Sequence, residues 1–316
     1  MFENISNKFA NTFKAKKRIW LIIPFVLFML IMFIVPMIII LVAAFLPVSS
    51  NGIAGNPTDN FDIVDGYVWQ KIFKSGWIAL ASTAICFLIG FPFAYFLSRI
   101  QNKVYKVSVI LFATAPIWSS VLVKLIGLKS LFDLIASANN NTITINSTHG
   151  DIFTIIGICY VYIPFLILPL YTVLDSMPKN YVLASQDLGY NAFSSFFFVV
   201  IPYCKAAIIS SLILVLLPAF TTVAIPQFLN NSNDSTMIGD YIFNLGANGL
   251  ESNLAIAQAS GVSLILGVFI LSVFALWKGI PKIVQLIKRK ISTGSFVGPK
   301  KDKKIRINPI MSKGIN

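Results

Sequence analysis

The stretch Tyr181-Val-Leu-Ala-Ser-Gln-Asp-Leu-Gly189, continued by Val199-Val-Ile-Pro202, is a polar interruption between two long apolar runs. The interruption covers residues 175–205, which is long enough for two short helices outside a bilayer. Proline ends helices, so Pro202 is expected to end the second helix before the next apolar run. Small residues give the first helix a face that another protein can approach closely: Ala184, Ser185 and Gly189. The pattern indicates a membrane protein with a docking helix on one side.

The composition is that of an integral membrane protein. Of the 316 residues, 56% are hydrophobic and 12% are charged, and the mean hydropathy is +0.79. Soluble domains carry about 25% charged residues. A hydrocarbon core of about 30 Å needs roughly 20 apolar residues to cross it. The runs of suitable length are approximately residues 20–46, 76–97, 107–123, 152–174, 206–228 and 254–277. We expect an all-α integral membrane fold with six transmembrane helices.

The basic residues are sorted to one side of these runs. All but four of the 25 Lys and Arg residues lie in the N-terminus, the 99–106 loop, the 175–205 segment and the C-terminal tail. Basic residues concentrate on the cytoplasmic side of membrane proteins, so both termini and the 175–205 segment are predicted to be cytoplasmic. The formal net charge of +13 is concentrated on this side of the runs. Attraction of the Lys-rich tail to anionic lipid headgroups explains it better than a nucleic-acid partner.

The chain divides into three parts on this pattern. Residues 1–71 form a cytoplasmic N-terminus, a first transmembrane helix and an outer loop. Residues 72–277 form a five-helix membrane unit, and residues 278–316 form a basic cytoplasmic tail. The first apolar run lacks a small-residue cleavage site, which favours a retained helix over a signal peptide.

The sequence offers little catalytic chemistry of its own. No Gly-Lys dipeptide is present, which excludes a Walker A phosphate loop. The single histidine and three cysteines show no metal-ligand spacing, and no nucleophile–base set is apparent. We therefore expect no enzyme activity, no metal and no cofactor. Energy for transport would come from another polypeptide that binds the 175–205 segment.

Several polar residues near the apolar runs are candidates for lining a path through the membrane. They are Lys124, Asp133, Asp151, Thr221, Thr222 and Gln227. Each also fits an ordinary structural role. A lysine near the outer surface can extend its ammonium group to water, and the two acids can be plain outer-loop residues. The threonines and the glutamine can serve as hydrogen-bonding groups between helices.

The 181–202 segment resembles the cytoplasmic signature of ATP-binding-cassette (ABC) importer permeases. That signature is Glu-Ala-Ala, three residues, Gly, nine residues, Ile, one residue and Leu-Pro. Aligned on Gly189, this chain has Leu183-Ala184-Ser185 at the start and Val199, Ile201 and Pro202 at the end. Leu183 replaces the family Glu, which removes any salt bridge made there. The resemblance implies a coupling helix in a groove of the ATPase subunit. The implied coupling residues are Ala184, Ser185, Asp187, Gly189 and Pro202.

Other segments resemble one branch of that family, the B-type permeases of spermidine/putrescine importers. Ile89-Gly-Phe-Pro-Phe-Ala-Tyr-Phe-Leu97 is similar to the end of their second span, and residues 157–171 and 214–219 continue the likeness. The resemblance implies the type I importer permease fold and polyamine translocation by alternating access. The implied partners are a second permease subunit in a heterodimer, two ATPase subunits and an extracytoplasmic polyamine-binding protein.

The sequence leaves three alternative functions open. A membrane scaffold or insertion protein would explain the apolar runs, but it leaves the 175–205 segment without a purpose. The permease could serve an importer for another small solute, since related permeases share much of the pattern. An ion-gradient secondary transporter would need no ATPase, but it usually shows inverted repeats and more charge inside the membrane, neither of which is visible here.

Overall fold

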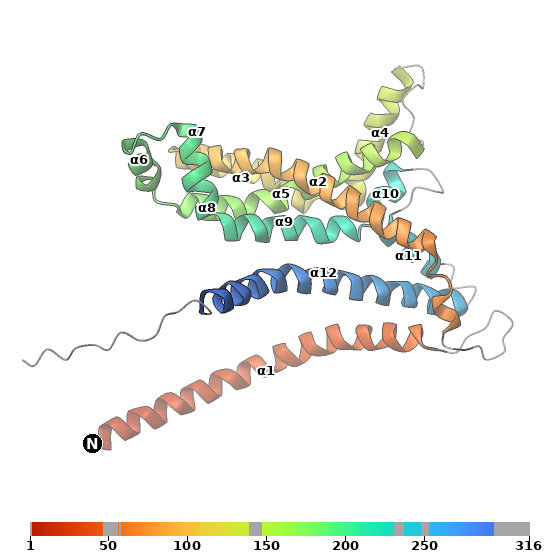
Figure 1. Ribbon diagram of the computed structural model, residues 1–316, viewed down its shortest axis with the longest axis horizontal. Helices are drawn as coiled ribbons and strands as arrows, with labels where there is room; N and C mark the ends of the chain where they lie inside the picture. Colours follow the sequence, from red (N-terminus) through yellow and green to blue (C-terminus); the bar gives the residue numbers. More distant parts are fainter. Residues whose placement is uncertain are drawn as a thin grey trace, which may run out of the picture. The chain divides into compact units, whose positions relative to one another are not determined.

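The structure is a computed structural model that describes residues 2–46, 56, 58–138, 147–230, 237–247 and 253–293. Every regular element in these ranges is a helix, which confirms the predicted all-α class (Figure 1). The elements are α1 (Phe2–Ala44), η1 (Asp59–Phe61), α2 (Gly66–Arg99), α3 (Lys103–Trp118), α4 (Val121–Ala138), α5 (Ser147–Ser176), α6 (Asn180–Asp187), α7 (Ala192–Ser195), η2 (Phe196–Val200), α8 (Ile201–Tyr203), α9 (Lys205–Phe220), α10 (Ala224–Leu229), α11 (Ile238–Ala247) and α12 (Asn253–Thr293).

The helices account for up to six membrane spans. Those long and apolar enough to cross alone are Ile22–Ala44, Gly66–Arg99, Gly150–Ser176 and Asn253–Ala275. Two helix pairs meet the same criterion only when taken together. Lys103–Trp118 and Val121–Ile135 are bent by 96°, and Ala192–Tyr203 and Lys205–Phe220 are bent by 73°. Counting each bent pair once gives six candidate spans, the number that the sequence predicts, although Ala192–Tyr203 belongs to the segment predicted to lie outside the bilayer.

Two predicted runs are not single helices. The run 107–123 contains the break between α3 and α4, where Ser119 and Ser120 follow Pro116. Serine side chains compete for backbone hydrogen bonds and so weaken a helix at this point; the Ser119 hydroxyl donates to the Pro116 carbonyl at 3.2 Å. The run 206–228 contains the break between α9 and α10. In a continuous helix the ring of Pro226 would clash with the carbonyl of Thr222, so the helix restarts at Ala224.

The core is built from α2, α5 and α9, each of which packs against the other two (Figure 1). Fully buried aliphatic side chains fill the space between them, among them Leu166, Leu170 and Val215. Helices α3 and α10 pack on α5, and α11 packs on α2 and α10.

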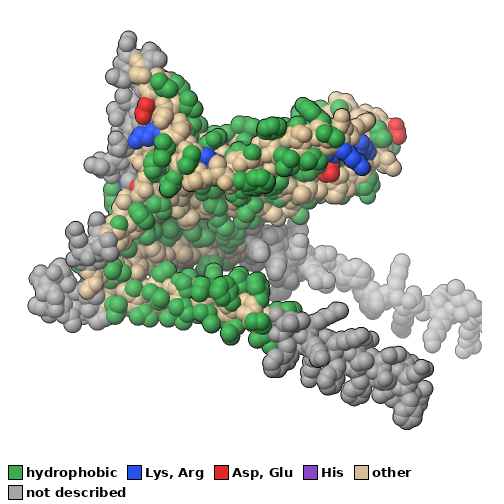
Figure 2. Space-filling view, turned by 180° about the vertical axis from the view of Figure 1, so that it is seen from behind, with side chains coloured by type: hydrophobic (Ala, Val, Ile, Leu, Met, Phe, Trp, Pro, Cys, Tyr) green, Lys and Arg blue, Asp and Glu red, His purple; other side chains and the backbone are tan. Residues whose placement is uncertain are grey.

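Charged side chains lie mainly at the two ends of this helical core, with hydrophobic side chains between them (Figure 2). At one end Lys74 near the start of α2 pairs with Asp151, with 3.1 Å between nitrogen and oxygen. At the other end Lys106 of α3 pairs with Asp175 of α5 at 2.6 Å. An apolar belt between two charged ends is the surface that a bilayer requires.

Residues 1–266 form one compact unit, and residues 267–316 form a second that includes the later part of α12. The backbone of the predicted basic tail continues as helix to Thr293, and residues 294–316 lie outside the described residues. The division at residues 71/72 and 277/278 stays a prediction.

Candidate functional site

The segment between α5 and α9, residues 177–204, is here called the connecting segment. It contains two helical runs, α6 and the continuous run α7–η2–α8, and α6 packs against both α7 and η2. The predicted pair of short helices is therefore confirmed. The first run begins with a turn in which the Pro178 carbonyl accepts the N–H of Tyr181 at 3.2 Å.

Gly189 ends α6 in a defined backbone conformation. Its φ is +90°, its N–H donates to the Gln186 carbonyl at 2.9 Å, and the N–H of Tyr190 donates to the Ser185 carbonyl at 3.1 Å. These two bonds form a Schellman motif, which satisfies carbonyls at the helix end and favours glycine at the positive φ. A Cβ at this position would meet no atom within 4 Å. The position therefore requires glycine for its backbone conformation and not for space within this chain.

Ser185 lies inside the connecting segment. It is 6% exposed, its hydroxyl donates to the Val182 carbonyl at 2.7 Å, and it is hydrogen-bonded to the hydroxyl of fully buried Ser195, also at 2.7 Å. Asn191 caps the start of α7 by accepting the N–H of Ser194 at 2.7 Å. The serine pair therefore fixes α6 to α7, and the two helical runs form one folded piece.

Phe196 attaches this piece to the core. Its ring packs on two rings of α2, those of Phe91 at 5.4 Å and Tyr95 at 5.0 Å between centroids, both in T-shaped geometry. Val200 and Cys204, further along the segment, are fully buried in the same core cluster. The connecting segment is therefore packed directly on α2.

The connecting segment exposes several large apolar side chains. Leu188 is 80% exposed, Phe193 73% and Phe198 69%, although the segment lies at a charged end of the helical core. A group of large exposed apolar side chains on a polar side of a protein is typical of a protein–protein contact.

At the opposite end of α2, helix α11 carries a buried carboxylate. Asp240 is 1% exposed, and the side-chain amide of Asn244 donates to it at 3.2 Å. Gln227 of α10 in turn donates to Asn244 at 3.5 Å. Burial raises the pKa of Asp240, while hydrogen bonds from Gln227 and Asn244 and the charge of Lys71 act in the opposite direction.

The start of α11 is held at the break between α9 and α10. The N–H of Ile238 donates to the hydroxyl of fully buried Ser75 on α2 at 2.7 Å. A Cβ at Gly239 would clash with the carbonyl oxygens of Thr221 and Thr222, so the two backbones touch here. Residues from three distant parts of the chain thereby meet around Asp240.

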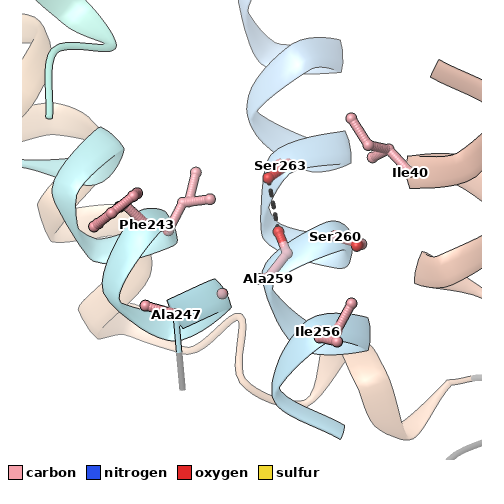
Figure 3. Close-up of a pocket in the computed structure, with 9 residues that line it drawn as sticks. Ile40, Phe243, Ala247, Ile256, Ala259, Ser260 and Ser263 are labelled. Atoms are coloured by element: carbon pink, nitrogen blue, oxygen red, sulfur yellow. Dashed lines mark hydrogen bonds between the residues drawn. The ribbon is translucent and has the colours of Figure 1, made fainter. Parts of the chain in front are cut away.

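A separate pocket of about 400 Å³ lies beside other residues of α11 (Figure 3). Ile40 of α1, Phe243 of α11 and Ile256 of α12 are among its lining residues. The hydroxyl of Ser263 donates to the Ala259 carbonyl of its own helix at 2.7 Å and is thus already satisfied. The lining is mainly apolar and contains no charged side chain, so it does not suit a charged solute.

Comparison with known proteins places this geometry in a family. Residues 87–282 match the model of the binding-protein-dependent transport system inner membrane component family. This match covers the connecting segment, α5, α9 and the C-terminal part of α2. The chain belongs to this family.

Individual members of the family are similar to this chain over most of their length. The chain is 42% identical to the spermidine/putrescine transport system permease protein PotB homolog of Mycoplasma genitalium, over 87% of this chain and 96% of that protein. It is likewise 42% identical to the homolog of Mycoplasma pneumoniae, over 88% and 96%. It is 31% identical to the spermidine/putrescine transport system permease protein PotB of Haemophilus influenzae, over 72% and 80%.

Family membership fixes the general role of the chain. It is a multi-pass membrane permease of an ABC transporter, and other subunits of such a transporter hydrolyse ATP. The transporter also comprises another permease component and a binding protein. The predicted permease class and the predicted lack of enzyme activity in this chain are confirmed.

The coupling residues predicted for the permease lie together in the connecting segment. Ala184, Asp187, Gly189 and Pro202 are exposed, and Ser185 is buried. A contact between Ser185 and an ATPase would therefore depend on its effect on helix packing. These coupling roles stay predictions.

The predicted path residues fall into two groups. Thr221, Thr222 and Gln227 lie at the α9–α10 break, close to Asp240. The other three lie elsewhere. Lys124 and Asp133 are on α4, the first buried and the second exposed. Asp151 of α5 has one carboxylate oxygen on Lys74 and the other on the side-chain amide of Asn230 at 3.1 Å.

Sequence reasoning missed three residues of these sites: Asp240, Lys71 and Phe196. Asp240 had a usable signal, because it stands within the apolar stretch Met237-Ile-Gly-Asp-Tyr-Ile-Phe243, where a lone acid is expected to be buried. Phe196 had none, since it is one of three consecutive phenylalanines and only the packing distinguishes it from Phe197 and Phe198.

Proposed function

We propose that this permease carries the polyamines spermidine and putrescine into the cell as a membrane subunit of an ATP-driven importer. The similarity to the Mycoplasma genitalium relative, which extends over nearly the whole of both chains, is the observation that carries the proposal. Polyamines are flexible polycations at neutral pH. In the proposed topology the outer segments contain eight acidic and four basic residues, and this excess of negative charge suits such a solute.

The proposed assembly contains a second permease in a heterodimer, two ATPase subunits and an extracytoplasmic polyamine-binding protein. Both termini and the connecting segment face the cytoplasm, as the distribution of basic residues supports. The exposed apolar side chains of the connecting segment dock on the ATPase. Ala184, Asp187 and Gly189 are the proposed contacts, and Ser185 and Pro202 shape the segment.

In this mechanism, ATP-driven closure of the ATPase subunits displaces the connecting segment as one piece. The Ser185–Ser195 bond keeps α6 and α7 together, and the rings of Phe91 and Tyr95 transmit the displacement from Phe196 to α2. Rocking of α2 with α5 and α9 then opens the pathway alternately to each side.

The test is uptake of labelled spermidine and putrescine by the complex that copurifies with this chain, reconstituted in proteoliposomes with ATP and its binding protein. We expect ATP-dependent uptake that unlabelled polyamine suppresses and unlabelled arginine does not. Vesicles without ATP and vesicles without the binding protein are the controls.

Each alternative predicts a different result. A copurifying ATPase without polyamine uptake would contradict the substrate and leave an importer of another solute. Uptake that follows an imposed ion gradient and ignores ATP would contradict the coupling to an ATPase.

A further inference from the structure

The buried carboxylate of Asp240 has the surroundings of a cation site. Two exposed side chains, Gln227 and Asn244, are hydrogen-bonded to each other and to this carboxylate. Carboxamides can rotate and exchange partners at little cost. A group that displaces them from outside would reach Asp240 directly.

The break between α9 and α10 adds backbone oxygens to the same place. The last carbonyls of a helix lack intrahelical partners, and the helix end carries a partial negative charge. The carbonyls of Thr221 and Thr222 lie against Gly239, the residue that precedes Asp240. Broken helices that present carbonyls beside a carboxylate are a recurring way to bind cations within membrane proteins.

Lys71 of α2 carries a buried positive charge in the same region. It is 3% exposed, its ammonium lies 4.8 Å above the ring centre of Tyr67, and its charge acts on Asp240. A buried carboxylate without a cation is strongly unfavourable. The group that Lys71 offers, a primary ammonium, is also the terminal group of putrescine and spermidine.

We propose that Asp240 binds an ammonium group of the transported polyamine at the outer end of the pathway, and that Lys71 is the counter-ion which this ammonium replaces. The exchange of one ammonium for another keeps the buried site neutral in both states. An ammonium has three donors, which Asp240 and the neighbouring carbonyl and amide oxygens can accept. The identity of the solute rests on the proposed function above.

If the role of Asp240 is purely structural, a different result is expected. Asp240 stands in the first turn of α11, where an acid stabilises a helix through its dipole. In that case removal of either Asp240 or Lys71 would weaken the fold, and both changes would impair uptake. In our proposal the two changes have opposite effects on the KM for polyamine.

The experiment measures initial rates of spermidine and putrescine uptake with the whole reconstituted complex. We expect Asp240→Asn to raise KM by roughly tenfold or more for both solutes, because a charged hydrogen bond is lost. Lys71→Met removes the competing ammonium and is expected to lower KM. Asp62→Asn, an exposed acid on the same side of the chain, is the matched control and should leave KM unchanged. ATP hydrolysis stimulated by the binding protein should persist in all three variants.

A chemical measurement on the unaltered complex covers the case in which a variant fails to fold. A hydrophobic carbodiimide reacts with protonated carboxyl groups, and mass spectrometry locates the resulting N-acylurea. We expect modification of Asp240 that spermidine and putrescine suppress and sorbitol does not. Equal KM values for Asp240→Asn and the unaltered complex would overturn the proposal, as would equal losses in Asp240→Asn and Lys71→Met or labelling insensitive to polyamines. Absence of polyamine uptake by the unaltered complex would instead refute the proposed function.

Discussion

The ring of Phe196 meets the ring of Tyr95 at 76°, with 5.0 Å between centroids, and this contact joins the connecting segment to the C-terminal end of α2. The same helix reaches Lys71 and Ser75 near its start, beside the buried carboxylate of α11. A single helix of 34 residues therefore links the proposed ATPase contact with the proposed cation site. A rigid helix can couple two sites in this way if both bias its position.

Replacing Phe196 tests this link. Loss of a partly buried phenylalanine and its ring contacts is expected to weaken the attachment by about 2 kcal/mol. We expect Phe196→Ala to reduce uptake roughly tenfold while most ATP hydrolysis persists, because ATPase closure would no longer displace α2 effectively. Phe112→Ala on α3, whose side chain is 81% exposed, is the matched control. Normal uptake by Phe196→Ala would refute the link.

Substitutions at Gly189 test whether the position requires glycine for its backbone conformation or for the space around it. Because φ is +90° and a Cβ would meet nothing, the cost of substitution depends on the backbone preference of the new residue. A β-branched residue at positive φ costs roughly 1–2 kcal/mol or more, whereas asparagine tolerates such a conformation. We expect Gly189→Val to abolish uptake without preventing membrane insertion, and Gly189→Asn to retain most of it. Similar loss in both variants would instead indicate that the ATPase fills the space around Gly189.

Alanine substitutions at two glycines of α11 are expected to have different effects on stability. A methyl group at Gly239 would clash with backbone carbonyls, whereas one at Gly246 would meet only the Ala259 methyl at an ordinary 3.8 Å. We expect Gly239→Ala to lower the unfolding temperature of the detergent-solubilised complex. Gly246→Ala should be neutral or stabilising by up to about 1 kcal/mol, since alanine favours helix. Equal unfolding temperatures for the unaltered and Gly239→Ala complexes would argue against the close backbone contact.

The raised pKa of Asp240 predicts the pH dependence of uptake. Binding of an ammonium requires the ionised carboxylate, so uptake should fall on acidification at a higher pH than an ordinary aspartate would give. The charge of Lys71 on α2 acts on Asp240. Tyr67 of α2, the α2 N-cap residue Asp65 and Tyr241 of α11 lie in the same region, and residues 206–230 contain no ionisable side chain. Asp240→Asn should remove this acidic limb from the pH profile of uptake measured with a pH-insensitive energy supply.

The raised pKa of Asp240 also affects the stability of the folded protein. A carboxyl whose pKa is higher in the folded than in the unfolded state favours folding only while protonated. Its contribution therefore declines as the pH rises from the ordinary value of 3.8 through the raised folded value. At neutral pH the ionised group is a net cost, so Asp240→Asn should unfold at the same or a higher temperature than the unaltered protein. A large drop in unfolding temperature would favour the structural role of Asp240.

The sequence by itself determined the membrane class, the number of spans, the distribution of charge and the spacing of the connecting segment. These features depend on local composition measured against a fixed bilayer thickness, so no distant contact can change them.

Only the tertiary structure decided which polar residues are buried together. Lys71 is far from Gln227 and Asp240 along the chain, and the packing of α11 on α2 and α10 brings the three residues together. Ser185 belongs to the face of small residues in sequence, yet the fold of the connecting segment turns it toward Ser195 and away from the surface. Composition cannot predict such placements, because burial is set by which helix faces meet, and that choice depends on the whole set of packing contacts.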